Sequence, residues 1–202
     1  MPTKDYIEQI DGAERRTIDT TLEVRAENGQ EYFEGVGVVF NSVTDLEYFT
    51  EEIATGAFDE VMNDDVRGLF NHGEDVVLGR NKSGTMVLTV DNNDVKYKIK
   101  YNPNDPDHVR VMEKVKRGDI SQSSFAFTVK DDKWETRNGK DHRTVLKIKK
   151  WYDVSPVTYP AYANTSVAAR SLDKVKKENI DHKKDLAEMD SDSMKRDLKV
   201  KL

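Results

Sequence analysis

A serine on a predicted strand is the residue whose setting best suits nucleophilic chemistry. Within residues 121–127, Phe125 and Phe127 alternate with Ser124 and Ala126. This period of two predicts a strand whose aromatic face lies in the core and whose other face carries Ser124. A hydroxyl on a rigid strand, flanked by small side chains, can be reached by a base and by a substrate carbonyl. The alternative is that Ser124 is only a polar residue on a solvated face.

A base for this serine must come from another part of the chain, which has four histidines: His72, His108, His142 and His182. His72 ends a predicted strand, where its ring would be held by the scaffold and remain accessible. His108 is expected on a solvated helix, His142 after a turn and His182 in a charged tail. Since the pKa of histidine suits proton transfer near neutral pH, His72 is the best candidate for a general base. A structural or solvated histidine is the alternative.

The composition argues against several other kinds of site. The absence of cysteine excludes disulfides, thiolate catalysis and cysteine-ligated metals. The sequence has no His-Glu-x-x-His motif, and Gly35-Val-Gly37 lacks the third glycine of a phosphate-binding loop, so neither a metal nor another cofactor is expected.

Charge and hydropathy define the class of protein. A net charge of -6 and a pI near 5.4 argue against a nucleic-acid-binding surface. The sequence contains no apolar run of about 18 residues, so no membrane span is expected. Its N-terminus lacks the apolar core of a signal peptide. We therefore expect an intracellular soluble protein.

Most of the elements that position Ser124 and His72 are predicted to be strands. The run from Gly35 to Phe40 indicates a buried strand whose two glycines allow close backbone approach. Residues 91–94 are turn formers between two alternating strands, and Asn138-Gly139 marks a second hairpin. Residues 67–72 form a further strand, and we expect Gly73 and Gly79 to bracket a loop after it.

Two helices are predicted. The longer one is capped by Asp105 or Asp107, has Pro106 in its first turn and ends at Gly118. Its spacing points Val109, Met112 and Val115 inward. A shorter helix is expected to start at Thr55 or Gly56 and to run to Met62.

The two ends of the chain differ from its middle. Residues 1–17 are expected to be flexible, with Glu14-Arg15-Arg16 as a solvated charge cluster. Residues 18–170 form the predicted domain. Residues 171–202 hold nine Lys/Arg and eight Asp/Glu, with no glycine, proline or aromatic residue, which predicts a mobile or marginally helical tail.

Five segments together resemble a known family. They are Phe70-Asn71-His72, Leu78-Gly79-Arg80, the stretch 118–127, the stretch 152–162, and residues 52–58. The first four, in this order along the chain, resemble the prohead maturation proteases of tailed phages, the HK97 prohead protease family, and residues 52–58 fit the family's segment before the histidine. The likeness runs from about residue 21 to residue 170. Such proteases resemble the herpesvirus assembly proteases, which implies an α+β, mostly β fold: a β-barrel with peripheral helices.

The resemblance implies roles for individual residues. Ser124, directly before Phe-x-Phe, matches the nucleophile, and His72 matches the base. Asp153 matches the acidic third member, although it could instead be a surface aspartate that caps a turn. Arg80 with Gly79, or backbone N–H groups near Ser124, are candidates for the oxyanion site, whereas Arg80 in a structural ion pair is the alternative.

One position departs from the family pattern. The residue before the nucleophile is often bulky and apolar in the family, and here it is Ser123. Period two places Ser123 on the face of Phe125 and Phe127, and Ser124 on the opposite face.

By resemblance, the protein is a serine endopeptidase inside the phage procapsid, in the host cytoplasm. Its partners would be the major capsid protein, whose scaffolding segment it cleaves, and itself, and the resemblance leaves room for a homo-oligomer. From its composition, we expect the charged tail of residues 171–202 to be a removable segment that recruits the protease to the capsid lattice. The alternative is a non-enzymatic scaffolding or capsid-assembly protein that retains the fold. An esterase has no support, because no Gly-x-Ser-x-Gly motif occurs.

Overall fold

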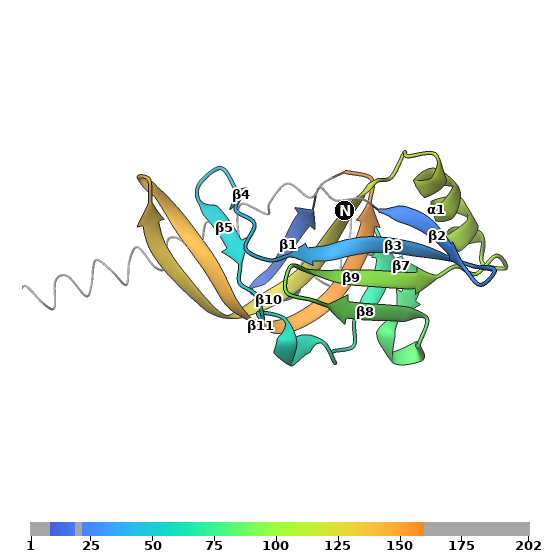
Figure 1. Cartoon of the computed structure of the whole chain (residues 1–202), viewed down its shortest axis with the longest axis horizontal. Coiled ribbons are helices and arrows are strands. Elements are labelled where there is room, and N and C mark those ends of the chain that lie inside the picture. The colour runs from blue at the N-terminus through green and yellow to red at the C-terminus, as the bar shows by residue number, and fades with distance from the viewer. Residues whose placement is uncertain (1–8, 19–21, 160–202) are drawn as a thin grey trace, which may run out of the picture. The chain divides into compact units, whose positions relative to one another are not determined.

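A computed structural model describes residues 9–18 and 22–159, which form two β-sheets and three short helical segments (Figure 1). The first sheet has seven strands: β1 (Ala13–Ile18), β4 (Thr44–Asp45), β5 (Thr50–Ile53), β6 (Arg67–Phe70), β7 (Gly73–Arg80), β10 (Gln122–Arg137) and β11 (Lys140–Val157). The second sheet has four: β2 (Glu23–Glu27), β3 (Gln30–Val39), β8 (Met86–Val90) and β9 (Asp94–Lys100). The helical segments are α1 (Pro106–Lys116) and the 3₁₀ turns η2 (Asp59–Val61) and η3 (Asn81–Ser83).

The long hairpin of β10 and β11 is the centre of the first sheet. Its strands pair from Gln122↔Val157 to Arg137↔Lys140. Asn138 and Gly139 both have positive φ, as the predicted two-residue turn requires. β1 lies antiparallel against the other side of β10, while β5 and β6 lie parallel to β11.

One core joins the two sheets. Phe33, Tyr97 and Ile99 from the second sheet share a buried cluster with Phe125 and Trp151 from the first. The sheets approach closely at Gly37, where an added Cβ would lie 3.1 Å from Val154. The glycine of β3 therefore leaves room for a side chain of the other sheet.

The predicted fold class is confirmed in its mostly β content. Among the described residues, however, the strands form two separate sheets rather than one closed barrel. The path of the first sheet ends at β1 and β4, and the second sheet ends at β2 and β8. Since these edge strands do not pair with one another, the described strands do not close on themselves.

Helix α1 begins as predicted. The side chain of Asp105 accepts a hydrogen bond from the backbone N–H of Asp107 at 2.9 Å. The prediction for its faces was partly wrong: Val109 is 38% exposed, whereas His108 is buried. The His108 ring packs 5.8 Å from that of Phe33, and burial lowers the pKa of this histidine.

Three other local predictions differ from the structure. The helix expected to end at Met62 is only the single turn η2. Gly79 and Arg80 lie on strand β7, not in a loop. Residues 13–17, expected to be flexible, belong to β1, and Glu14 and Arg16 are buried rather than solvated because oppositely charged side chains surround them.

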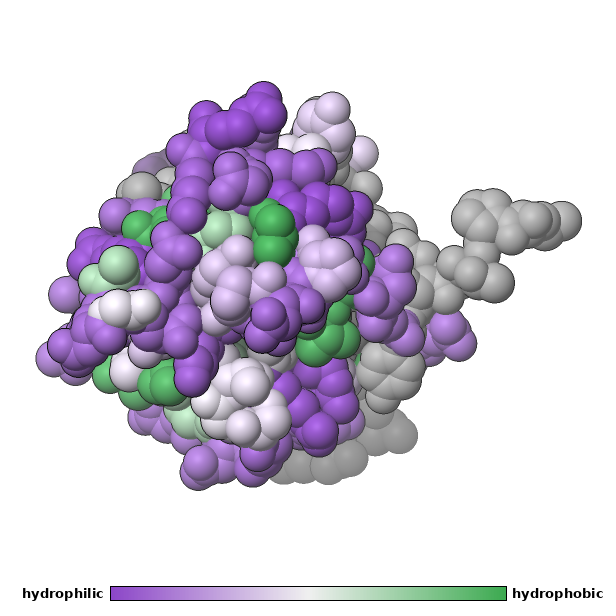
Figure 2. Space-filling view, turned by 90° about the vertical axis from the view of Figure 1, so that its right-hand side faces the viewer, coloured by the Kyte–Doolittle hydropathy of each residue, from purple (hydrophilic) through white to green (hydrophobic). Residues whose placement is uncertain are grey.

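The chain divides into residues 1–165 and 166–202. The predicted tail, with His182, lies outside the described residues. On the side of the molecule that carries α1, the surface is mostly hydrophilic with scattered apolar residues (Figure 2). No helix within the described part of the chain is long and apolar enough to cross a membrane.

Candidate active site

A tight turn between β6 and β7 presents His72. Phe70 pairs with Gly73 across it, and the two central residues, Asn71 and His72, have φ of 54° and 59°. Positive φ at both central positions is the geometry of a type I′ hairpin turn, in which asparagine is favoured. Positive φ is uncommon for a residue other than glycine, and such backbone strain concentrates at functional sites.

Asn71 fastens this turn to the end of β11. Its backbone N–H donates to the carbonyl of Pro156 at 3.0 Å. Its side-chain amide donates to Thr158 Oγ1 at 3.1 Å, and its side-chain oxygen accepts from the Thr158 N–H at 2.8 Å. Because Asn71 precedes His72 directly, these bonds also hold the backbone that carries the imidazole.

The two adjacent serines of β10 point in opposite directions, as predicted. Ser123 Oγ lies 2.7 Å from the hydroxyl of Tyr97, within the shared core. Burial raises the pKa of Tyr97, although the bond to Ser123 opposes this. Ser124 instead lies on the face where His72 and Asp153 converge.

His72 joins Ser124 to Asp153. Its Nδ1 lies 2.6 Å from Asp153 Oδ1, and its Nε2 lies 2.7 Å from Ser124 Oγ. All three side chains are buried. When Nδ1–H donates to the carboxylate, Nε2 is left as the acceptor that faces the serine hydroxyl. This arrangement can take a proton from Ser124 and stabilise the imidazolium that forms.

Two residues of β11 hold Asp153 in place. The hydroxyl of Ser155 donates to Asp153 Oδ1 at 2.7 Å, and the indole N–H of Trp151 donates to the Asp153 carbonyl at 3.1 Å. The strand pairing places Ser155 opposite Ser124. Sequence reasoning missed both supports. Their only signal was position, two residues before and two residues after the carboxylate.

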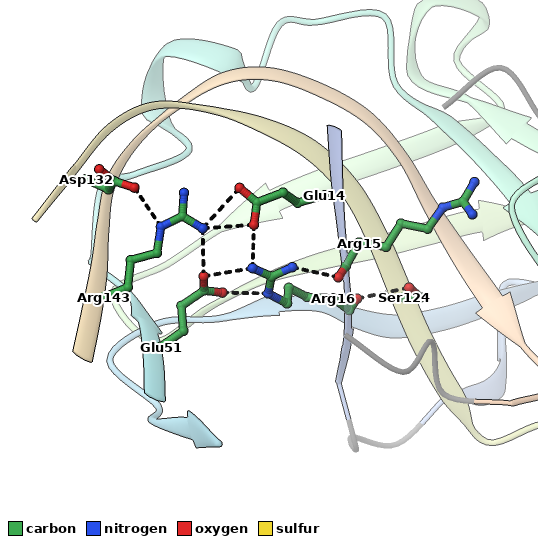
Figure 3. Close-up of polar contacts among 7 residues, drawn as sticks. All are labelled: Glu14, Arg15, Arg16, Glu51, Ser124, Asp132 and Arg143. Atoms are coloured by element: carbon green, nitrogen blue, oxygen red, sulfur yellow. Dashed lines mark hydrogen bonds and ion pairs between the residues drawn. The ribbon is translucent and has the colours of Figure 1, made fainter. Parts of the chain in front are cut away.

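Strand β1 covers the hydroxyl of Ser124. Thr17 is the residue of β1 paired with Ser124, and Ser124 Oγ donates to the carbonyl of Arg16 at 3.0 Å (Figure 3). A hydroxyl has a single proton, so the backbone carbonyl of Arg16 and Nε2 of His72 compete for the proton of Ser124. Ser124 is 0% exposed, which rules out the solvated-face interpretation.

A cavity of about 510 Å³ borders His72. It is lined by Asp65, Arg67, Leu69, His72, Glu74, Val77, Lys150, Tyr152 and Asp153. Ser124 does not line it. His72 and Asp153 are therefore nearer to open space than the hydroxyl of Ser124.

The other candidates lie apart from this cluster. Arg80 holds Asp65 through two bonds, Nε to Oδ1 at 2.6 Å and a second guanidinium nitrogen to Oδ2 at 2.7 Å. This pairing lowers the pKa of Asp65 to about 2. Gly79 packs against Ile99, which an added Cβ would approach to 2.9 Å. Their role at the oxyanion stays a prediction.

The remaining histidines make other contacts. His142 is buried, with Nδ1 2.8 Å from Thr50 Oγ1 and Nε2 3.2 Å from Glu52. His108 packs on aromatic rings, as described above. Of the three histidines within the described residues, His72 is the one that contacts a serine of β10.

Comparison with known proteins gives one match. No curated protein and no solved structure matched this chain. A family model described as the caudovirus prohead serine protease matches residues 20–178, which is most of the sequence and spans His72, Ser124 and Asp153. The chain therefore belongs to the caudovirus prohead serine protease family.

Proposed function

We propose that this chain is a serine endopeptidase in which Ser124 is the nucleophile, His72 the general base and Asp153 the residue that orients the histidine. The observation that supports the proposal is the continuous chain of short hydrogen bonds, 2.6 Å from Asp153 to His72 and 2.7 Å from His72 to Ser124. These residues come from β11, the β6–β7 turn and β10. A constellation assembled from three separate elements is recognised by its geometry and roles, not by sequence spacing.

The chemistry follows from these positions. Ser124 Oγ bonds to the carbonyl carbon of the scissile peptide while His72 takes its proton. The bond to the leaving nitrogen then breaks, and His72 donates that proton to the departing amine. Water attacks the acyl-enzyme with His72 again as base, which releases the carboxylic acid and restores Ser124. The carboxylate of Asp153 stabilises the imidazolium that forms.

The oxyanion of each tetrahedral intermediate needs fixed donors. Backbone N–H groups near Ser124 are one candidate and Arg80 is another. Arg80 would have to leave Asp65 to serve this role, since both of its short bonds go to that carboxylate.

The family points to a role in phage capsid maturation. Within that role, we propose that the substrate is the scaffolding segment of the major capsid protein and that the protease also cleaves itself, inside the procapsid. The 171–202 tail would recruit it to the capsid lattice. Truncation after Arg170 tests recruitment: unchanged packaging of the truncated protease into procapsids would contradict that role of the tail.

Co-expression with the cognate capsid protein, followed by intact-mass measurement of both chains, tests the activity. The wild type should shorten the capsid protein, and Ser124→Ala and His72→Ala should leave it whole. Ser123→Ala is the matched control, because it removes the adjacent hydroxyl from the opposite face of β10. Capsid assembly that Ser124→Ala changes no more than Ser123→Ala does would instead indicate a non-enzymatic assembly protein.

A further inference from the structure

Strand β1 lies on β10 in the way that an extended peptide adds to the edge of a sheet. It pairs antiparallel from Ala13↔Thr128 to Ile18↔Ser123, and the first sheet ends with it. Proteins that bind extended peptides commonly do so by adding a strand, with main-chain bonds for affinity and side-chain pockets for selectivity. The strand to which β1 adds is the one that carries Ser124.

The backbone of β1 meets the nucleophile at one residue. The carbonyl of Arg16 lies 3.0 Å from Ser124 Oγ. In an endopeptidase, the carbonyl nearest the nucleophile belongs to the residue on the acyl side of the scissile bond. Arg16 therefore takes the place of that residue, and the peptide bond from Arg16 to Thr17 takes the place of the scissile bond.

The side chain of Arg16 enters a site built for a positive charge (Figure 3). Glu51 on β5 holds the guanidinium with both oxygens, at 2.6 and 2.8 Å. Both side chains are buried, with 6% of Arg16 and 3% of Glu51 exposed. Burial opposes the charge of Arg16, but Glu51 and Glu14 outweigh it and raise its pKa. The planar guanidinium of arginine can donate two parallel hydrogen bonds to one carboxylate, whereas lysine supplies the positive charge without this paired geometry.

A second charged contact lies two residues earlier on β1. Glu14 accepts hydrogen bonds from Arg143 of β11 at 3.0 and 2.8 Å. Arg143 also reaches Glu51 at 3.0 Å and Asp132 at 2.6 Å. If β1 leaves, the carboxylates of Glu51 and Asp132 remain beside the single guanidinium of Arg143. The site then carries a net negative charge, which favours binding of a cationic side chain.

We propose that the edge of β10 covered by β1 is the substrate cleft, in which Glu51 selects arginine or lysine at the residue whose carbonyl Ser124 attacks. Arg143 favours an acidic residue two positions before it. The substrate class is thus an extended polypeptide segment with a Glu-x-Arg or Glu-x-Lys pattern. The inference rests on the proposed function, and it makes β1 a competitor that must leave before a substrate can bind.

A peptide that copies residues 13–20, with position 16 varied, tests the selectivity on the unmodified full-length chain. We expect kcat/KM for arginine to exceed that for glutamine by about 10-fold or more, because a buried carboxylate loses its partner when the cation is replaced. Glu51→Gln should reduce this ratio to near one. Glu52→Gln, on the same strand but bonded to Arg137 and Thr144, should preserve it.

Arg16→Gln tests the competition by β1 and does not depend on changing the pocket. If β1 competes with substrate, this variant should cleave the arginine peptide at least as fast as the wild type. A network that only stabilises the fold predicts slower cleavage. Two results would overturn this inference while leaving the proposed function intact, provided that the capsid protein is still processed in the parallel co-expression. The first is equal cleavage of the arginine and glutamine peptides, and the second is no cleavage of the arginine peptide by either the wild type or Arg16→Gln. Capsid protein left intact by the wild type would instead overturn the proposed function.

Discussion

Nδ1 of His72 lies 2.6 Å from Oδ1 of Asp153, although 81 positions separate the two residues in the chain. The carboxylate comes from a central strand and the imidazole from a strained turn, and separate hydrogen bonds hold each of them. Such preorganisation is what a serine protease needs, since the imidazole must keep one orientation while it moves a proton.

Asp153→Asn should leave the fold intact and lower kcat by about 10⁴-fold, because an amide in place of the carboxylate favours the wrong histidine tautomer. Cleavage rates on the capsid protein, with circular dichroism as the check on folding, measure this. Asp65→Asn is the matched control, since that carboxylate binds Arg80 and Arg67 instead. Equal losses in both variants would contradict an orienting role for Asp153.

Ser155 donates a hydrogen bond to Asp153, and we expect it to position that carboxylate. Ser155→Ala removes one hydrogen bond to the carboxylate, and we expect kcat to fall by about 10-fold while KM stays constant, in line with about 1.5 kcal/mol for a bond to a charged group. Ser155→Thr keeps the hydroxyl and should recover most of the rate. A rise in KM with kcat unchanged would assign Ser155 to substrate binding instead.

Asn71→Ala should lower the free energy of unfolding by about 1–2 kcal/mol. The substitution removes two side-chain hydrogen bonds to Thr158 and places alanine, which disfavours positive φ, at this position. Asn71→Gly loses the same bonds but tolerates that backbone, so its loss should be smaller. Urea denaturation measures both. Equal losses would show that the turn geometry contributes nothing to the effect.

Ser123→Ala should destabilise the fold by about 1–3 kcal/mol and leave kcat close to that of the wild type. The cost arises because the buried hydroxyl of Tyr97 loses its partner. Adding Tyr97→Phe should recover part of the loss, since neither hydroxyl then remains unpaired. Thermal denaturation of the single and double variants tests this, and a large fall in kcat would contradict it.

Lowering the pH should weaken the association of β1 with the rest of the first sheet. Burial by itself would raise the pKa of Glu14, but Arg16 and Arg143 outweigh it, and the pKa lies below the usual 4.5. The other charges in the cluster are Glu51 of β5 and Asp132 of β10. Because the folded pKa is depressed, the contribution of Glu14 to stability is complete above pH 4.5. It declines below that and is lost as the pH falls through the folded value.

Hydrogen exchange of the β1 amides between pH 7 and pH 3, corrected for intrinsic rates, measures this release. Protection over residues 13–18 should decline below pH 4.5 before that of the β8–β9 hairpin. Glu14→Gln should show weaker protection at neutral pH and little further change with acid. Protection of β1 that is constant with pH would contradict the prediction.

Local patterns were enough to predict much of the region around Ser124. Alternation in β10 separates the two serines by face, since successive side chains of a strand point to opposite sides. Turn chemistry predicts the hairpin at Asn138-Gly139. Such signals lie within a few residues of one another, so the sequence alone carries them. Position at the end of a predicted strand favoured His72 as the base, and the resemblance then indicated Asp153, but no local pattern connects these two residues with each other.

Only the folded chain decides which distant groups meet. Glu14 and Arg16 have the composition of a solvated cluster. However, Glu51, which accepts two hydrogen bonds from the guanidinium of Arg16, lies 35 positions away, and this pairing accompanies the burial of Arg16. Likewise, Arg80 has the type of an oxyanion donor, but Asp65 holds it in the structure. The sequence does not show whether a charged side chain will be solvated or paired with a buried counter-ion. The difference is a long-range contact, which tertiary structure alone supplies.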